Sequence, residues 1–256
     1  MPDAPEVLLI TGGSRGIGAA TARLAAAHGY AVAITYLANQ PAVDALVAEL
    51  TEASATAIAI RADAASEADT IRAFDTAEQQ LGPITALVNN AAIDHHSPVA
   101  DLDASELERL LAVNVTGTML GCREAVRRMA HSRGGLGGAI VNVSSMDATI
   151  GGRPGAAAYA ATKAAVDAFT IGIAREVADD GIRVNALRPG MTRTDMTDYL
   201  EDPTTESRIA STIPMNRIAT PDEIAAPILW LLSEEASFIS GACLDASGAG
   251  FWIGRR

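Results

Sequence analysis

Short apolar runs alternate with longer stretches that carry apolar side chains at helical spacing. The apolar runs expected to form buried strands are 7–11, 31–36, 56–61, 87–89 and 139–143. The stretches expected to form helices between them are 14–28, 41–54 and 66–81. Strands that alternate with helices build parallel sheets from βαβ units. The pattern therefore predicts an α/β fold, a doubly wound parallel sheet with helices on both faces.

The chain shows no internal boundary. It has 256 residues, 49% of them hydrophobic, and neither a shift of composition nor a Pro/Ser-rich linker divides it. We expect one domain over residues 1–256. The polar stretch 191–218, interrupted by Pro203 and Pro214, is expected to be a mobile lid. On this lid, Tyr199 and Met215 are candidates for substrate contact, although ordinary packing explains them equally well.

A helix with a clear start follows the lid. Residues 220–223 read Thr-Pro-Asp-Glu, which supplies an N-cap, a proline at the first helical position and the glutamate of a capping box. Pro227 lies inside the same helix and is expected to kink it.

Charge and composition exclude several classes of function. The chain has 31 acidic and 19 basic residues, so a net charge of −12 argues against nucleic acid as a partner. The N-terminus lacks the features of a signal peptide and no apolar run reaches 18 residues, so we expect a soluble cytoplasmic protein without a membrane partner. Cys122 and Cys243 have no partners at metal-ligand spacing, so we expect buried free thiols and no metal site.

A glycine loop connects the first expected strand to the first expected helix. Gly12, Gly16 and Gly18 follow the strand 7–11, and a helical run over 19–25 comes next. Glycines at such a turn allow the backbone to approach a pyrophosphate, whose charge the helix N-terminus then stabilises. A simple tight turn is the alternative for a glycine loop alone. The strand before it and the helix after it favour a dinucleotide site.

The end of the second expected strand indicates which dinucleotide binds. An acid that binds the ribose 2′-hydroxyl of NAD is expected there, but 35–39 contain none and the first acid is Asp44. Arg15 in the glycine loop, with Ser14 and Asn39, could instead bind a 2′-phosphate. The pattern therefore favours NADP(H) over NAD(H). A solvated loop charge is the alternative role for Arg15.

A tyrosine, a lysine and a pair of hydroxyls lie in one segment of the chain. Tyr159 and Lys163 are four residues apart in an alanine-rich helical run, so they share one face of the helix. A nearby ammonium is expected to lower the pKa of the phenol toward neutrality. Ser144 and Ser145 follow the buried strand 139–143, at the sheet edge where ligands bind. A solvated helix face is the alternative for the Tyr/Lys spacing alone.

Six motifs occur together in a fixed order. They are the glycine loop, Asn89-Asn90-Ala91-Ala92, Asn114, Ser144-Ser145, Tyr159 with Lys163, and Pro189-Gly190. From about residue 7 to 250, the chain resembles the short-chain dehydrogenases/reductases, and within them NADPH-dependent 3-oxoacyl carrier-protein reductases and sugar or polyol dehydrogenases. The resemblance implies a Rossmann-type sheet.

The resemblance also implies roles for individual residues. Tyr159 corresponds to the general acid/base, Lys163 to the lysine that lowers its pKa and binds the nicotinamide ribose, Asn114 to the asparagine that holds a water of the proton relay, and Ser145 to the serine that holds the substrate oxygen. The cofactor-binding residues implied are Gly12, Ser14, Arg15, Gly16, Ile17, Gly18, Tyr36, Asn39, Asp63, Ala64, Asn90, Ala91, Ala92, Tyr159, Lys163, Pro189, Gly190, Thr192 and Thr194.

Two features depart from the family pattern. Ala92 replaces the usual glycine of Asn-Asn-Ala-Gly, which is expected to alter the backbone beside the cofactor. The gap from Ser145 to Tyr159 is fourteen residues where thirteen is common, so Ser144 remains an alternative. His95 and His96, on the loop after the fourth strand, are expected to be a solvated pair at the mouth of the substrate cleft.

The expected function is an NADPH-dependent oxidoreductase that passes a hydride between the cofactor and a small-molecule carbonyl or secondary alcohol. The alternatives are an NAD-dependent sugar or polyol dehydrogenase and a non-catalytic NADPH-binding sensor. Small residues crowd the helix of Tyr159, and in the family this helix and the one at about 105–131 pair across a two-fold axis. We therefore expect a homotetramer or a homodimer.

Overall fold

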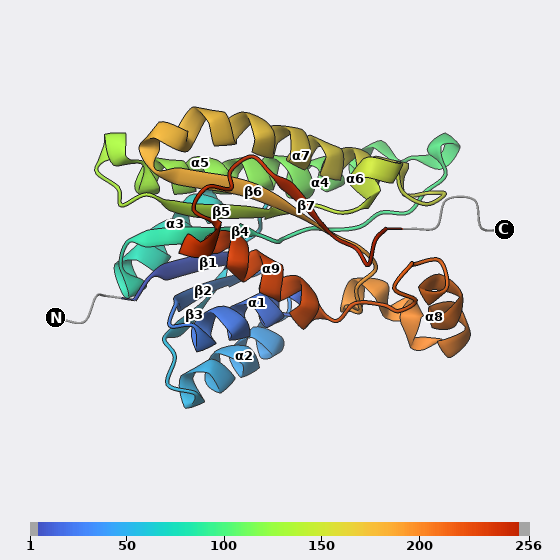
Figure 1. Ribbon diagram of the computed structural model, residues 1–256, viewed down its shortest axis with the longest axis horizontal. Coiled ribbons are helices and arrows are strands. Elements are labelled where there is room, and N and C mark those ends of the chain that lie inside the picture. The colour runs from blue at the N-terminus through green and yellow to red at the C-terminus, as the bar shows by residue number, and fades with distance from the viewer. Residues whose placement is uncertain (1–4, 251–256) are drawn as a thin grey trace.

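The computed structural model describes residues 5–250, which contain a seven-stranded parallel sheet of order β3-β2-β1-β4-β5-β6-β7 (Figure 1). The strands are β1 (Val7–Thr11), β2 (Ala31–Tyr36), β3 (Ala57–Arg61), β4 (Ile84–Asn89), β5 (Gly138–Val143), β6 (Ile182–Pro189) and β7 (Cys243–Ala246). The strand order reverses beside β1, where β2 pairs on one side and β4 on the other. The predicted doubly wound α/β fold is confirmed.

Helices cover both faces of the sheet. The helices are α1 (Gly16–Ala27), α2 (Gln40–Glu52), α3 (Glu67–Leu81), α4 (Ala104–Leu111), α5 (Thr118–Met129), α6 (Asp147–Ile150), α7 (Ala157–Val177), α8 (Pro203–Ala210) and α9 (Pro221–Leu232). Helices α1, α2 and α9 pack on one face of the sheet, and α3, α5 and α7 pack on the other. Among residues 5–250, no helix combines the length and apolar character needed to cross a membrane.

Alternation along β1 divides the core into two layers. Leu8 and Ile10 pack in the hydrophobic cluster beneath α1 and α9, whereas Val7 and Leu9 pack in the cluster under α3, α5 and α7. All four side chains are fully or almost fully buried. A strand covered on both faces has no polar side, so it appears in the sequence as a continuous apolar run. This burial fixes the end of β1, and with it the position of the glycine loop.

The stretch 105–131 contains a break in its α-helix that the sequence pattern does not predict. One helix was expected there, but a π-helix over Ala112–Gly117 separates α4 from α5. A π-turn accommodates an extra residue in the helix and is frequent at functional sites. Further along the chain, α9 begins with the predicted capping box and continues through Pro227 to Leu232.

The lid stretch 191–218 has more structure than its polar composition indicates. It contains a 3₁₀ segment, Asp195–Glu201, and helix α8, which Asp202 caps and in which Pro203 occupies the first position instead of breaking the chain. Its apolar residues form a small cluster of their own, made of Leu200, Ile209, Ile213 and Ile218. The stretch is therefore more regular than its composition indicates, while its mobility as a lid stays a prediction.

The two thiols differ from each other. Both cysteines are free, as expected, but only Cys122 is buried, whereas Cys243 at the start of β7 is half-buried. The reason is position in the sheet, because β7 is one of the two edge strands and has a neighbour on one side only.

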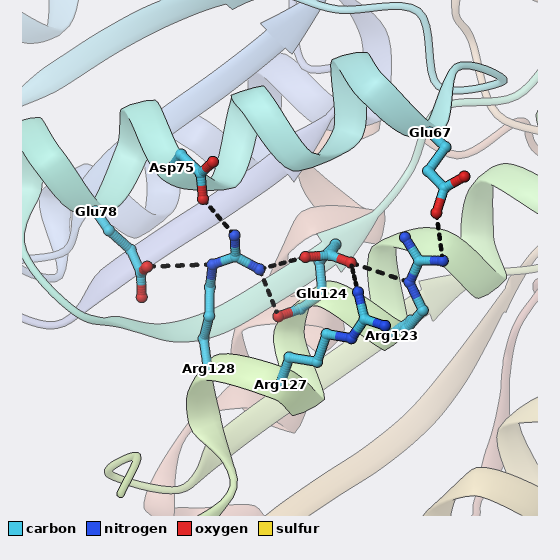
Figure 2. A network of polar contacts seen from close by, with 7 residues as sticks. All are labelled: Glu67, Asp75, Glu78, Arg123, Glu124, Arg127 and Arg128. Atoms are coloured by element: carbon cyan, nitrogen blue, oxygen red, sulfur yellow. Dashed lines mark hydrogen bonds and ion pairs between the residues drawn. The ribbon is translucent and has the colours of Figure 1, made fainter. Parts of the chain in front are cut away.

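A network of ion pairs around a buried glutamate joins α5 to α3. Figure 2 shows Glu124 among three arginines of its own helix, with contacts of 3.0 Å to Arg123, 2.9 Å to Arg127 and 2.5 Å to Arg128. Arg128 also reaches Asp75 and Glu78 on α3, at 2.5 and 3.1 Å, and Arg123 reaches Glu67 at 2.7 Å. The Glu124 side chain is only 3% exposed, so its charge depends on these partners.

Candidate active site

A cavity of about 650 Å³ lies along the carboxyl ends of the strands. Its walls come from the glycine loop and from the segments that follow β2, β3, β4, β5 and β6. Of the predicted site residues, all line this cavity except Gly18 and Asn114. The structure therefore brings together residues from Gly12 to Thr194 that are remote in sequence.

The glycine loop is held against the end of β4. The Asn90 side-chain amide donates to the carbonyl oxygens of Thr11 and Gly12, at 3.1 and 2.8 Å. Gly12 has a φ of +63°, and a Cβ there would lie 2.8 Å from the Ala91 Cα. Arg15 occupies the N-cap of α1, but no side chain caps the first N–H groups of the helix. These donors are therefore placed to meet an anion at the loop.

Gly18 is packed too closely to carry a side chain. It does not line the cavity, and a Cβ at this position would lie 2.7 Å from both Asn90 Nδ2 and Gly13 Cα. This glycine therefore permits the close approach of α1 to Asn90 and Gly13, while its part in cofactor binding stays a prediction. Ala92 introduces no strained backbone, because the described residues other than glycine with positive φ are Ser54, Asn216 and Ala249.

Two charged residues of the predicted cofactor set already have partners. The Arg15 guanidinium pairs with the Asp195 carboxylate at 3.0 Å, which joins the glycine loop to the first turn of the lid. Asp63 pairs with Arg109 at 3.0 Å and accepts a hydrogen bond from the Ala65 N–H at 2.9 Å. Asp63 thus orders the turn after β3, while Arg15 is held by an exposed ion pair.

Lys163 is buried between α7 and the end of β5. Its Nζ donates to the Val143 carbonyl oxygen at 2.9 Å and lies 5.7 Å from the centre of the Tyr159 ring. Burial lowers the pKa of Lys163 to about 8, although Asp167 and Asp94 oppose that shift. Ser144 is also buried, and its hydroxyl donates to the Lys163 carbonyl oxygen at 3.2 Å. Ser144 thereby joins the end of β5 to α7.

The pKa of Tyr159 departs from the expectation. Burial raises the pKa of the phenol, Asp94 and Asp147 raise it further, and the Ser145 hydroxyl lowers it by hydrogen bonding. The expectation that the nearby Lys163 ammonium brings this pKa toward neutrality is wrong for this structure. The physical reason is desolvation, which disfavours the phenolate more strongly than the surrounding groups favour it.

Ser145 bonds the Tyr159 hydroxyl, whereas Asn114 has other partners. Ser145 lines the cavity, and its hydroxyl oxygen accepts a hydrogen bond from the Asp147 N–H at 3.1 Å. Asn114 lies in the π-helix, fully buried behind the cavity wall. Its side chain bonds both the N–H and the carbonyl oxygen of Ile93, each at 2.9 Å, and donates to the Thr162 hydroxyl at 3.2 Å. Asn114 thus links the loop after β4 to the first turns of α7.

The residues on the loop after β4 and on the lid differ from one another in exposure. His96 is exposed and bonds Asp94 at 2.8 Å, but His95 is only 25% exposed at its side chain and its Nε2 is buried without a hydrogen-bond partner. The prediction of a solvated pair is wrong for His95, because its loop folds back toward α4. Tyr199 lines the cavity, whereas Met215 lines a separate hollow.

Sequence reasoning missed five charged residues of the cavity, and three of them lie near Tyr159. Asp94, Asp147 and Arg153 line it near Tyr159 and belong to no recognisable motif. Their loops, 93–100 and 146–155, are joined by a backbone hydrogen bond of 2.9 Å from the Ser97 N–H to the Gly155 carbonyl oxygen. Their positions just after β4 and β5 were the available signal, because both strands end at the cavity.

Comparison with known proteins places the chain in a family. Residues 12–249 match the sequence model of a family described as enoyl-(acyl carrier protein) reductase. The chain belongs to the short-chain dehydrogenases/reductases. It is 44% identical to the oxidoreductase YgfF of Escherichia coli, over 94% of this chain and 98% of that protein.

Two further short-chain dehydrogenases/reductases extend the comparison. The 3-oxoacyl-[acyl-carrier-protein] reductase of Synechocystis is 35% identical, over 95% of this chain and 96% of that one. A short-chain dehydrogenase of Burkholderia cenocepacia, solved in complex with NADP, is 35% identical with a TM-score of 0.87, covering 96% and 98% of the two chains. The protein is thus an oxidoreductase of this family, and a solved relative binds NADP.

Proposed function

We propose that this protein is an NADPH-dependent oxidoreductase that interconverts a carbonyl compound and a secondary alcohol. The observation that supports this most is that one and the same cavity is lined by the glycine loop and by Ser145, Tyr159 and Lys163. A redox enzyme of this type must hold the dinucleotide and the reacting carbon next to each other.

The cavity residues fit a dinucleotide with a 2′-phosphate. The first turn of α1 presents N–H groups that no side chain caps, which suits a pyrophosphate. Residues 35–39, which line the cavity at the end of β2, are all uncharged. Arg15 lines the same region and offers the positive charge that a 2′-phosphate requires. Lys163 and 189–194 line the part that remains for the nicotinamide half.

The bound nicotinamide would supply or accept the hydride, and the chain supplies the proton chemistry. Ser145 would hold the substrate oxygen by a hydrogen bond and polarise it. Tyr159 would donate its phenolic proton to this oxygen in the reducing direction. In this structure burial raises the pKa of Tyr159, so the phenol holds the proton that it would donate. Lys163 would bind the nicotinamide ribose and Asn114 a water of the proton relay, as in related enzymes.

Two alternative functions remain, and each requires a different property of the protein. An NAD-dependent sugar or polyol dehydrogenase would use the same Ser145, Tyr159 and Lys163 but prefer NADH. A non-catalytic NADPH sensor would need only the nucleotide loop, so the presence of the complete reactive group argues against it.

The test is NADPH consumption across a panel of carbonyl compounds with wild-type protein and Tyr159→Phe. We expect turnover by the wild type and a loss of about 10²–10⁴-fold in the variant, with NADPH binding retained, because a positioned acid contributes this much. Tyr30→Phe, a buried tyrosine that does not line the cavity, is the control. Binding without turnover would favour the sensor, and near-normal turnover in Tyr159→Phe would contradict the mechanism.

We further infer a homodimer or homotetramer built on α7. Ala161, Ala164 and Ala168 lie on its exposed face, where small side chains let a second helix approach closely. Light scattering at micromolar concentration should give at least twice the mass of 26.4 kDa. A monomer mass would contradict the inference.

A further inference from the structure

The substrate end of the cavity carries charge that the proposed reaction does not use. Asp94, His96, Asp147 and Arg153 all line it. Proton transfer by Tyr159 requires none of these side chains. A cavity wall next to a reacting carbon usually selects the substrate by hydrogen bonding. The arrangement of these four residues therefore bears on the class of substrate.

Asp147 is the charged side chain nearest to the serine in the chain. Its N–H donates to the Ser145 hydroxyl oxygen at 3.1 Å, so its backbone is fixed directly beside the group that would hold the substrate oxygen. The side chain is half-buried at the start of α6, and burial raises the pKa of its carboxyl. A carboxylate in such a position is stabilised by a ligand that donates a hydrogen bond to it.

Asp94 faces the same space from the other loop. It bonds His96 at 2.8 Å, and its charge acts on both Tyr159 and Lys163, so it lies close to the reactive group. The backbone bond from Ser97 to Gly155 joins the two loops, and Asp94 acts on Asp147 by charge, so the two carboxylates lie near each other in the wall of one cavity.

The charge balance of this wall disfavours an anion. Arg153 interacts with Asp147 by charge and with the Tyr199 hydroxyl by a hydrogen bond, so its guanidinium is matched by groups of the wall itself. Two carboxylates therefore stand against one guanidinium, with His96 bonded to Asp94. A substrate carboxylate placed here would meet an excess of negative charge.

Taken with the proposed function, on which this inference rests, the geometry points to a substrate with a second hydrogen-bond donor on the carbon next to the reacting carbon. The Asp147 carboxylate, with Asp94 behind it, would accept that hydrogen bond. The donor is a hydroxyl or an ammonium group, as in a vicinal diol or an amino alcohol. A simple alcohol offers no hydrogen-bond donor to the carboxylates of Asp94 and Asp147. The carboxylate of a hydroxy acid is repelled by them.

Four alcohols that share one skeleton test this directly. Isopropanol, propylene glycol, isopropanolamine and lactate differ only in the group beside the secondary alcohol, which is methyl, hydroxymethyl, aminomethyl or carboxylate. We expect kcat/KM with NADP⁺ to be about ten- to a hundred-fold higher for propylene glycol or isopropanolamine than for isopropanol, since a charge-assisted hydrogen bond contributes this factor. The kcat/KM for lactate should be lower than that for isopropanol. A preference for isopropanolamine over propylene glycol would identify the donor as an ammonium group, and the reverse as a hydroxyl group.

Two variants test whether Asp147 causes this preference between substrates. In Asp147→Ala the ratio of kcat/KM between propylene glycol and isopropanol should fall toward one, and the corresponding ratio for isopropanolamine should fall with it. Asp101→Asn removes an exposed carboxylate of the same region that does not line the cavity, and should leave both ratios unchanged. Because each ratio is measured within one protein preparation, partial misfolding of a variant does not imitate the result.

The outcomes separate this inference from the proposed function. If other carbonyl compounds are reduced but the wild-type ratio is near one, or the ratio is unchanged in Asp147→Ala, or lactate is preferred, the donor inference is wrong and the function stands. If no compound is turned over, the proposed function fails. The inference is then judged by thermal shift with NADP⁺ present, where equal stabilisation by propylene glycol and isopropanol would overturn it.

Discussion

Replacing Arg15 tests the cofactor assignment, because two anions would compete for its guanidinium. In the structure it pairs with Asp195 at 3.0 Å, and the two side chains are 59% and 54% exposed. An ion pair so open to solvent contributes about 0–1 kcal/mol. A charge-assisted contact with a 2′-phosphate contributes roughly 1.5–3 kcal/mol. The phosphate should therefore displace Asp195 at a small cost.

Arg15→Ala should weaken NADPH binding by about ten- to a hundred-fold and leave NADH binding nearly unchanged. Asp195→Asn should tighten NADPH binding by at most about five-fold, because the competing pair is worth no more than about 1 kcal/mol. Isothermal titration calorimetry with both cofactors measures these changes. Arg23→Ala is the matched control, since Arg23 is a similarly exposed arginine paired with Glu49 outside the cavity.

Three results would refute this reasoning. Wild-type protein that binds NADH as tightly as NADPH would remove the assignment of NADP(H). Equal losses of affinity for NADPH and NADH in Arg15→Ala would mean that the arginine supports the structure of the loop and does not bind the 2′-phosphate. An NADPH affinity that falls in Asp195→Asn would show that the ion pair assists binding and does not compete with it.

Ser145→Ala should reduce activity more than Ser144→Ala, because only Ser145 lines the cavity while Ser144 bonds the α7 backbone; equal losses in steady-state kinetics would contradict the assignment of Ser145 alone. Because burial raises the pKa of Tyr159, wild-type protein without cofactor and Tyr159→Phe should show the same phenolate absorbance at pH 10, and a clear deficit in the variant would contradict this. Glu124→Ala should lower the free energy of unfolding in urea by about 1.5–3 kcal/mol, because it removes the buried carboxylate that bonds Arg123, Arg127 and Arg128. Asp75→Ala, which removes a partner that is 63% exposed, should cost at most about 1 kcal/mol, and similar losses in the two variants would rule out a special role for burial.

The sequence alone was sufficient for the fold class and for most of the cavity. Buried parallel strands need continuous apolar runs, so β1 and β2 appear directly in the sequence with their observed limits. Glycines at 12 and 16 and the Tyr159/Lys163 spacing are local requirements of a turn and of a helix face, and local requirements leave a local pattern.

Tertiary structure decided what depends on segments that are distant in sequence. The π-helix at Asn114 carries no local signal, and neither does the close approach of Gly18 to Asn90. The direction of the Tyr159 pKa follows from burial, which no spacing of Tyr and Lys can indicate. The charged wall of Asp94 and Asp147 exists only because two loops end at the same edge of the sheet and bond each other there.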